Sequence, residues 1–142
     1  TQGMLRTITF IVGSFFGSIS FAQTNLTVEV QLSKTKGGSL RAALCPSESA
    51  FDTEKGCVFK AMDAIGKDVP LTFENVAPGT YAVKIFQDVD GDGKMGTNAL
   101  GIPNEPFGFS NNAMGNFGPP SFKQAAFEVG KEPVVIRLKL RG

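Results

Sequence analysis

The 142-residue chain contains no histidine and no tryptophan, and it has a single tyrosine. The absence of histidine removes the most common general base and the most common zinc ligand. Basic and acidic residues number 14 and 13, so no charge excess favours a nucleic-acid or membrane-surface partner.

The chain also lacks an apolar run of the length that spans a bilayer as a helix, which is about 20 residues. Its most apolar stretch begins with Met4-Leu5-Arg6 and ends with Ser20-Phe21-Ala22. A basic start, an apolar centre and small residues at the end are typical of a secretory signal peptide. We expect residues 1–22 to hold three upstream residues and a signal peptide cleaved after Ala22, and residues 23–142 to form one domain. This organisation predicts export to the periplasm or the extracellular space, with no membrane attachment after cleavage.

Cysteine is scarce, because Cys45 and Cys57 are the only two. In an oxidising compartment such a pair usually forms a disulfide. A loop of this size would stabilise the fold by roughly 3 kcal/mol in the chain-entropy model. The alternative is a reactive thiol, which needs an environment that lowers its pKa, and no histidine exists to provide one. We therefore expect the Cys45–Cys57 disulfide.

Glycine and proline are plentiful, with 17 and 8 residues, which favours turns over long helices. Short segments of alternating apolar and polar residues lie between the turns, as is typical of half-buried strands. We expect strands at residues 26–32, 39–44, 57–61 and 69–73, directly after the Pro78-Gly79 turn, and at residues 125–129 and 134–140. A short helical turn can begin near Ser47. About seven short strands predict an all-β fold, a single antiparallel β-sandwich with a long loop after the fifth strand.

One polar, glycine-rich stretch follows the fifth strand, in which Asp88, Asp90 and Asp92 alternate and Gly93 follows at once. This pattern is the first half of an EF-hand-type calcium loop, in which alternating carboxylates converge on one ion and the glycine permits a sharp turn. The second half is missing, because Gly96 and Ala99 occupy the ninth and twelfth positions. The expected calcium ligands are Asp88, Asp90, Asp92, the carbonyl of Lys94, and Asn98 or Glu105. The alternative is a solvated turn, since Asp and Gly are common turn residues.

The segment from residue 88 to residue 121 holds almost no strand signal, and loops of that length are uncommon in compact domains unless they are functional. Its aromatic residues argue against disorder. We expect four of them to pin the loop onto the sandwich: Phe107, Phe109, Phe117 and Phe122. The alternative is an exposed binding surface for a protein or glycan, formed by Phe107, Phe109, Asn111, Asn112 and Phe117.

The stretch from Phe73 to Val83 is similar to a turn of prealbumin-like (transthyretin-like) sandwich modules, which carries an F-x-x-l-x-P-G-x-Y-x-V pattern. A longer set of spaced residues resembles the bacterial domain-of-unknown-function family 2141. The matching residues are Pro78-Gly79-Thr80-Tyr81-Ala82, Asp88, Asp90, Asp92-Gly93, Asn98, Gly101-Ile102-Pro103, Glu105, Gly108-Phe109-Ser110-Asn111, Gly118-Pro119-Pro120, Phe122 and Ala126-Phe127.

This resemblance covers essentially the whole of residues 23–142, and it implies an exported single-domain sandwich with no established activity. The chain departs from the family pattern at two positions. Gln87 stands where the family often has histidine, and Gly96 stands where it often has aspartate. Each change removes a potential metal ligand.

Three functions are compatible with these features. The one we expect is an exported, non-catalytic module that binds a protein or glycan ligand through the calcium-stabilised Asp/Gly-rich loop. The second is a purely structural or assembly domain, in which an exposed edge strand pairs with a partner. The third is a hydrolase that uses two carboxylates, Glu105 with one of the aspartates, although no nucleophile–base pair is visible.

Overall fold

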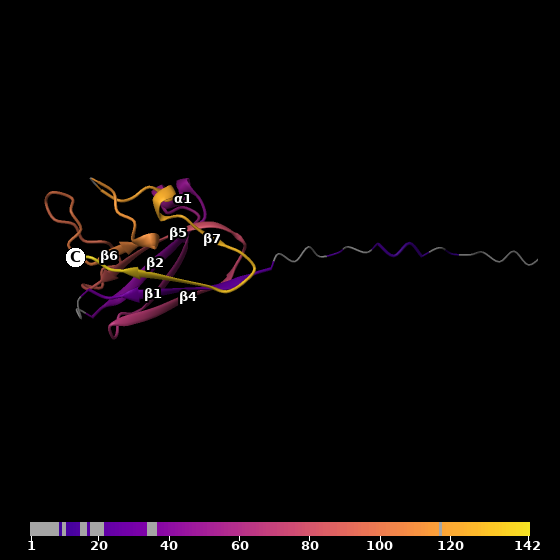
Figure 1. Cartoon of the computed structure of the whole chain (residues 1–142), viewed down its shortest axis with the longest axis horizontal. Coiled ribbons are helices and arrows are strands. Elements are labelled where there is room, and N and C mark those ends of the chain that lie inside the picture. Colours follow the sequence, from indigo (N-terminus) through magenta and orange to yellow (C-terminus); the bar gives the residue numbers. More distant parts are fainter. Residues whose placement is uncertain (1–8, 10, 15–16, 18–21, 34–36, 117) are drawn as a thin grey trace, which may run out of the picture.

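The computed structural model describes residues 9, 11–14, 17, 22–33, 37–116 and 118–142. The described residues before Ala22 form no helix or strand and extend away from the folded body (Figure 1). Most of the expected signal peptide therefore lies outside the described residues. In the described ranges, no helix combines the length and the apolar character that crossing a membrane requires.

The folded body contains eight strands and three short helices in the described part of the chain. In chain order they are β1 (Thr24–Gln31), β2 (Ser39–Cys45), α1 (Glu48–Thr53), β3 (Val58–Asp63), β4 (Asp68–Val76), β5 (Gly79–Asp88), β6 (Phe107–Phe109), the 3-10 helix η1 (Ser110–Asn112), α2 (Phe122–Ala125), β7 (Phe127–Val129) and β8 (Val134–Lys139). The mostly-β prediction is confirmed.

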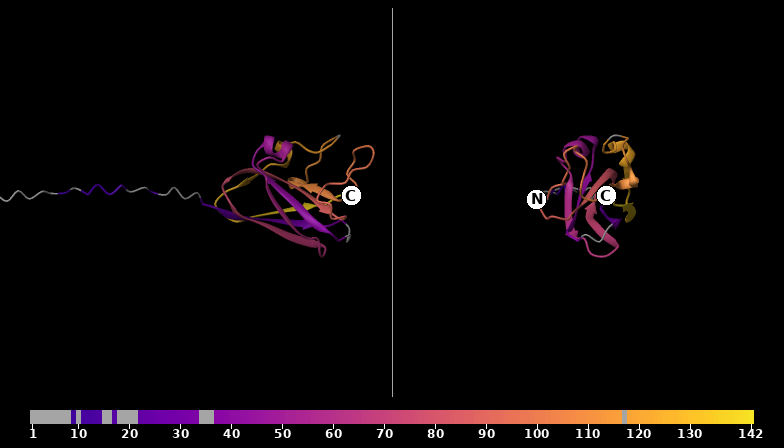
Figure 2. Two further views of the ribbon diagram at one scale, coloured as in Figure 1. Left: turned by 180° about the vertical axis from the view of Figure 1, so that it is seen from behind. Right: turned by 90° about the vertical axis from the view of Figure 1, so that its left-hand side faces the viewer.

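The strands form two sheets that share one apolar core (Figures 1 and 2). The first sheet has the order β4-β1-β8, and the second has the order β3-β2-β5-β6, with β7 also paired to β5. The core contains the alternating residues that the sequence pattern placed inward: Leu26, Val28, Val30, Leu40, Ala42, Leu44, Val83, Ile85, Leu138 and Leu140. Burying each Leu, Val or Ile side chain is worth about 1.5–3 kcal/mol, so this alternation is the main source of the fold's stability.

The expectation of a purely antiparallel sandwich is wrong for the first sheet. β1 pairs with β4 antiparallel, but it pairs with β8 in parallel, with Leu26 opposite Val134 and Val28 opposite Ile136. Alternation with a period of two tells which side chains point inward, and it says nothing about strand direction. The alternation of apolar and polar residues is therefore compatible with either strand direction of β8.

The expectation of a strandless segment over residues 88–121 is also wrong at one place. Phe107–Phe109 forms β6, which pairs antiparallel with β5 so that Phe109 faces Lys84 and Phe107 faces Phe86. Three residues are too few to show a period, so this strand left no signal in the sequence. The described residues consequently form eight strands in two sheets, rather than a single seven-stranded antiparallel sandwich.

A second apolar cluster covers part of the outer face of the β3-β2-β5-β6 sheet, where α1 and α2 lie together. The ring of Phe51 in α1 lies 6.1 Å from the rings of Phe109 and Phe122. Phe107 also packs against this cluster, with its ring 6.1 Å from that of Phe109. The prediction that phenylalanines pin the long segment onto the body is thus confirmed for Phe107, Phe109 and Phe122, whereas Phe117 lies outside the described residues.

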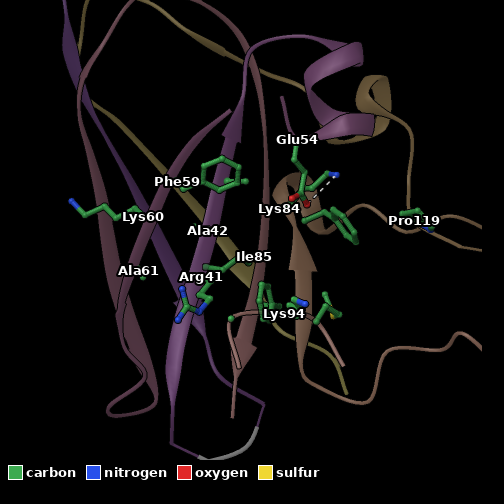
Figure 3. A pocket seen from close by; sticks show the side chains of 15 residues that line it. Arg41, Ala42, Glu54, Phe59, Lys60, Ala61, Lys84, Ile85, Lys94 and Pro119 are labelled. Carbon is green, nitrogen blue, oxygen red and sulfur yellow. Dashed lines mark ion pairs between the residues drawn. The ribbon is translucent and has the colours of Figure 1, made fainter. Parts of the chain in front are cut away.

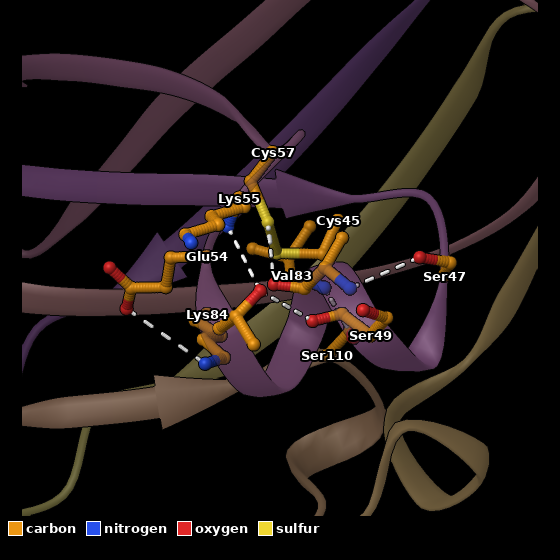
Figure 4. The surroundings of a disulfide bond; sticks show 11 residues. Cys45, Ser47, Ser49, Glu54, Lys55, Cys57, Val83, Lys84 and Ser110 are labelled. Carbon is orange, nitrogen blue, oxygen red and sulfur yellow. Dashed lines mark hydrogen bonds and ion pairs between the residues drawn. A yellow bond between two sulfur atoms is a disulfide. The ribbon is translucent and has the colours of Figure 1, made fainter.

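The disulfide between Cys45 and Cys57 encloses α1 and fixes it to the end of β2 (Figure 4). α1 begins after Ser47, whose hydroxyl accepts a hydrogen bond from the Ala50 N–H, as the sequence suggested. α2 was not predicted, although Ser121 and Gln124 form a capping box at its start.

Candidate functional site

Four carboxylates meet at the end of β5. One oxygen from each of Asp88, Asp90, Asp92 and Glu105 lies within 4.8 Å of the others. Asp88 is the last residue of β5, and Glu105 comes two residues before β6. Because β5 and β6 pair antiparallel, both ends of the intervening loop return to the same point, and the Gln87 N–H donates to the Pro106 carbonyl at 2.8 Å. The β5–β6 pairing therefore brings Glu105 beside the three aspartates at the start of the loop.

Asp88 is fully buried and has three hydrogen-bond donors. Its Oδ2 accepts from the Arg41 Nε at 2.8 Å and from the Gly93 N–H at 2.9 Å, and its Oδ1 accepts from the Gly91 N–H at 3.1 Å. Burial on its own raises the pKa of Asp88, but the bonds from Arg41 and Gly93 outweigh it and hold the pKa below its ordinary value. The side chain is thus an ionised anchor for the loop.

Glu105 lies at the end of the loop that precedes β6 and is only 6% exposed. Its Oε2 accepts from the Val89 N–H at 2.7 Å, and its Oε1 accepts from the Gly96 N–H at 2.8 Å. These two bonds cross from one side of the loop to the other. Glu105 therefore sets the loop's shape as well as contributing a carboxylate to the cluster.

Asp90 and Asp92 lie on the exposed side of the cluster. Each closes a local turn, since Asp90 Oδ1 accepts from the Asp92 N–H at 3.3 Å and Asp92 Oδ1 accepts from the Lys94 N–H at 2.9 Å. The Asp92 N–H lowers the pKa of Asp90, but desolvation and the neighbouring carboxylates of Asp88 and Asp92 outweigh it and raise that pKa above its ordinary value. A bound cation would reduce the repulsion between these carboxylates.

The other expected ligands are placed differently. Lys94 belongs to the same loop, next to the carboxylate cluster. Asn98 does not join the cluster through its side chain, because its Oδ1 accepts the N–H groups of Leu100 and Ile102 at 2.9 and 3.1 Å. Its amide oxygen closes its own turn with these two N–H groups, and its role as a calcium ligand stays a prediction.

Two residues near the site were missed by the sequence analysis. Arg41 lies on β2, 47 positions before Asp88, and no local pattern links the two. Asn104 fills the space beside Gly96, where an added Cβ would collide with the Asn104 Oδ1 and lie 3.3 Å from the Glu105 Oε1. The site thus holds an amide oxygen in the space that a side chain at position 96 would enter.

The residues of the expected aromatic binding surface lie on β6 and η1. Phe109 is buried, whereas Phe107 is half-buried. The Asn111 Nδ2 donates to the Ala126 carbonyl at 2.8 Å, and the Asn112 Oδ1 accepts from the Lys139 N–H at 2.9 Å. Both amides therefore connect η1 to neighbouring elements, and Phe117 lies outside the described residues. Ligand binding by this surface stays a prediction.

A family model described as an uncharacterized protein conserved in bacteria (DUF2141) matches residues 28–137. The matched range runs from within β1 to within β8 and includes all four clustered carboxylates. No curated protein and no solved structure matches the chain significantly.

Proposed function

The chain belongs to the DUF2141 family of uncharacterized bacterial proteins, and we propose that it is an exported, non-catalytic β-sandwich module of prealbumin-like type whose Asp/Gly-rich loop binds calcium. In this proposal the ion stiffens the segment between β5 and β6, and the stiffened module recognises a protein or glycan ligand. One observation carries the calcium part, which is the convergence of four carboxylate oxygens to within 4.8 Å.

The hydrogen bonds already made by these carboxylates leave room for an ion. A carboxylate oxygen has two lone pairs. Asp88 Oδ1 and both Glu105 oxygens each accept one N–H group, while Asp88 Oδ2 accepts two donors. Calcium takes six to eight oxygen ligands, from carboxylates, carbonyls and water. Four carboxylates, with the Lys94 carbonyl and solvent, supply such a set.

The electrostatics favour the same interpretation. Without a cation, the clustered carboxylates repel one another, and this repulsion adds to desolvation in raising the pKa of Asp90. Arg41 offsets part of this charge through its ion pair with the buried Asp88, whereas Asp90 and Asp92 are exposed. A divalent ion bound from the solvent side would neutralise the exposed pair.

The geometry favours a binding role over a carboxylate-dependent hydrolase. A general acid or base must reach the proton that it transfers. Glu105 is only 6% exposed, Asp88 is fully buried, and both are held by donors within the chain. The two exposed aspartates sit on one short turn, where they are better placed to share an ion than to flank a substrate.

Thermal unfolding with calcium and with excess chelator tests this proposal. A ligand that binds only the native state stabilises it by about 2.7 kcal/mol at a hundredfold excess over its dissociation constant, which is several degrees for a domain of this size. We expect a midpoint increase with millimolar calcium and a smaller one with magnesium, which prefers a stricter octahedral site. An unchanged midpoint would reduce the loop to a solvated turn.

One observation favours assembly as a second candidate. β3 is the edge strand of its sheet, and its Val58 and Phe59 side chains are 58% and 63% exposed. An exposed apolar edge is a template for pairing with another chain. Sedimentation of the wild type and of Val58→Lys would test it: self-association that the lysine abolishes supports assembly, and a monomer at every concentration argues against pairing between copies.

A further inference from the structure

The part of the β3-β2-β5-β6 sheet that α1 and α2 leave uncovered forms a groove of about 690 Å³ (Figure 3). The strand register dictates its floor. One cross-strand row places Ala61, Arg41 and Phe86 side by side, and the next row places Phe59, Ala43 and Lys84 side by side. The short side chain of Ala61 is exposed and leaves the floor hollow beside Arg41 and Phe59, whereas Ala43 is only 5% exposed.

Two separate segments wall the groove. Glu54, which follows α1, lies at one end, and Gly93, Lys94 and Met95 of the Asp/Gly-rich loop lie at the other. Pro119 lines a further side (Figure 3). The volume falls within the range of about 300–1,000 Å³ that is usual for small-molecule sites. The groove is therefore of a size that suits a small molecule.

The charge of the groove is one-sided. Four basic residues line it, Arg41, Lys60, Lys84 and Lys94, against a single acidic residue, Glu54. Arg41 is paired with Asp88 at 2.8 Å, and the Lys84 Nζ lies 3.8 Å from Glu54 and 4.6 Å from the centre of the Phe51 ring. The Lys60 Nζ donates to the Thr72 carbonyl and points away from the floor (Figure 3). Among the residues that the structure describes, Lys94 forms no ion pair.

We propose that this groove binds a small amphipathic monoanion, a carboxylate or sulfonate carried on an aromatic or aliphatic body. The anionic group meets Lys94, and the body lies over Ala61 beside the exposed Phe59 ring. The positive charge of the groove suits a ligand with one anionic group, because Arg41 and Lys84 already have acidic neighbours. This site goes beyond the calcium loop and does not rest on it.

A matched pair of fluorescent dyes tests the inference. Anilinonaphthalene sulfonate carries one negative charge, and phenylnaphthylamine is the same ring system without the sulfonate. We expect the purified wild-type protein to bind the sulfonate more tightly than the neutral dye, and only the binding of the sulfonate to weaken as salt is raised, because salt screens exposed charges. Titrations in calcium and in chelator keep this result separate from the outcome for the calcium loop.

Two variants and a control locate the dye. Lys94→Gln should weaken sulfonate binding by roughly threefold to fivefold, the size of one exposed charge interaction, and leave the neutral dye unchanged. Ala61→Trp should abolish binding of both dyes, because the indole fills the groove from an exposed edge-strand position. Lys131→Gln, in the exposed turn before β8, is the matched control and should change neither affinity.

The inference is overturned by any of three results. The first is the absence of saturable sulfonate binding to the wild type. The second is unchanged binding in Ala61→Trp, which would place the dye elsewhere. The third is an equal effect of Lys94→Gln and Lys131→Gln, which would show that the groove does not select for charge.

Discussion

The Arg41 Nε donates to the Asp88 Oδ2 at 2.8 Å, joining β2 to the first carboxylate of the Asp/Gly-rich loop. The Arg41 side chain is 41% exposed, whereas that of Asp88 is fully buried. Arg41 also lines the groove on the outer face of the sheet. One guanidinium therefore contacts both the carboxylate cluster and the groove, so the two proposed sites share a wall.

Asp90→Asn should stabilise the protein in chelator and remove its response to calcium. The asparagine Oδ1 keeps the acceptor for the Asp92 N–H, but the negative charge that crowds Asp88 and Asp92 is gone. Because the pKa of Asp90 is raised in the folded state, its ionisation lowers the free energy of unfolding of the wild type as pH rises through that pKa. The extra stability of Asp90→Asn should therefore disappear in acid, where Asp90 is protonated. Urea unfolding at several pH values measures it.

Asp52→Asn on the exposed side of α1 is the control for this experiment, since it removes a carboxylate outside the cluster. It should leave the calcium response intact. A calcium response that survives in Asp90→Asn would contradict the assignment of the loop as the site.

Asp88→Asn should destabilise the protein at neutral pH and lose this effect in acid. The pKa of Asp88 lies below its ordinary value because Arg41 and the Gly93 N–H outweigh its desolvation. A lowered folded-state pKa contributes stability that is present above the unfolded-state pKa, about 3.9, and is lost as pH falls through the folded-state pKa. The gap between wild type and variant should therefore close below about pH 3.9. A gap that is constant from neutral pH to acid would show that Asp88 acts through packing rather than charge.

Local patterns predicted much of this molecule, and non-local contacts account for what they missed. Alternation identified the inward residues of β1, β5 and β8, Ser47 marked the start of α1, and the cysteine count predicted the disulfide. Alternation has no polarity, so it could not reveal that β8 runs parallel to β1. The D-x-D-x-D-G spacing found Asp88, Asp90 and Asp92.

Local sequence patterns also could not identify residues of other strands that contact the carboxylate cluster. Arg41 is far from Asp88 in the sequence and meets it only because β2 and β5 are neighbours in the sheet. Spacing also could not show that the Asn98 amide oxygen closes a turn with the N–H groups of Leu100 and Ile102. Spacing finds residue types that suit a ligand set, and the hydrogen bonds decide which of them remain available.

Gly38→Ala should destabilise the protein far more than Gly37→Ala. Both glycines have positive φ, 77° and 72°, so each alanine carries a backbone cost of about 1–2 kcal/mol. At Gly38 an added Cβ would also collide with the Asp88 carbonyl, whereas at Gly37 it meets nothing within 4 Å. The collision should add about 2 kcal/mol to the loss in the free energy of unfolding. Equal losses in the two variants, measured by urea unfolding, would contradict this packing of the turn against Asp88.

Reduction of the Cys45–Cys57 disulfide should lower the free energy of unfolding by roughly 3 kcal/mol, because it releases the loop that carries α1. Urea unfolding with and without dithiothreitol measures the change. The double variant Cys45→Ala/Cys57→Ala is the control, and its stability should not depend on the reductant. A wild-type midpoint that is insensitive to reduction, with loss of the disulfide verified by thiol titration, would show that the bridge does not support the fold.

The most direct test of the calcium site follows the backbone amides that line it. The Gly91, Gly93 and Gly96 N–H groups donate to Asp88 and Glu105, so an ion on these carboxylates must change their surroundings. In a nitrogen–proton correlation spectrum titrated with calcium, we predict saturable shifts of these three amides, with those of Gly66 and Gly130 unchanged. Extracellular calcium modules bind with dissociation constants of about 0.1–1 mM, so the shifts should saturate at about 10 mM calcium. Glycine amides that stay in place over that range would contradict the account.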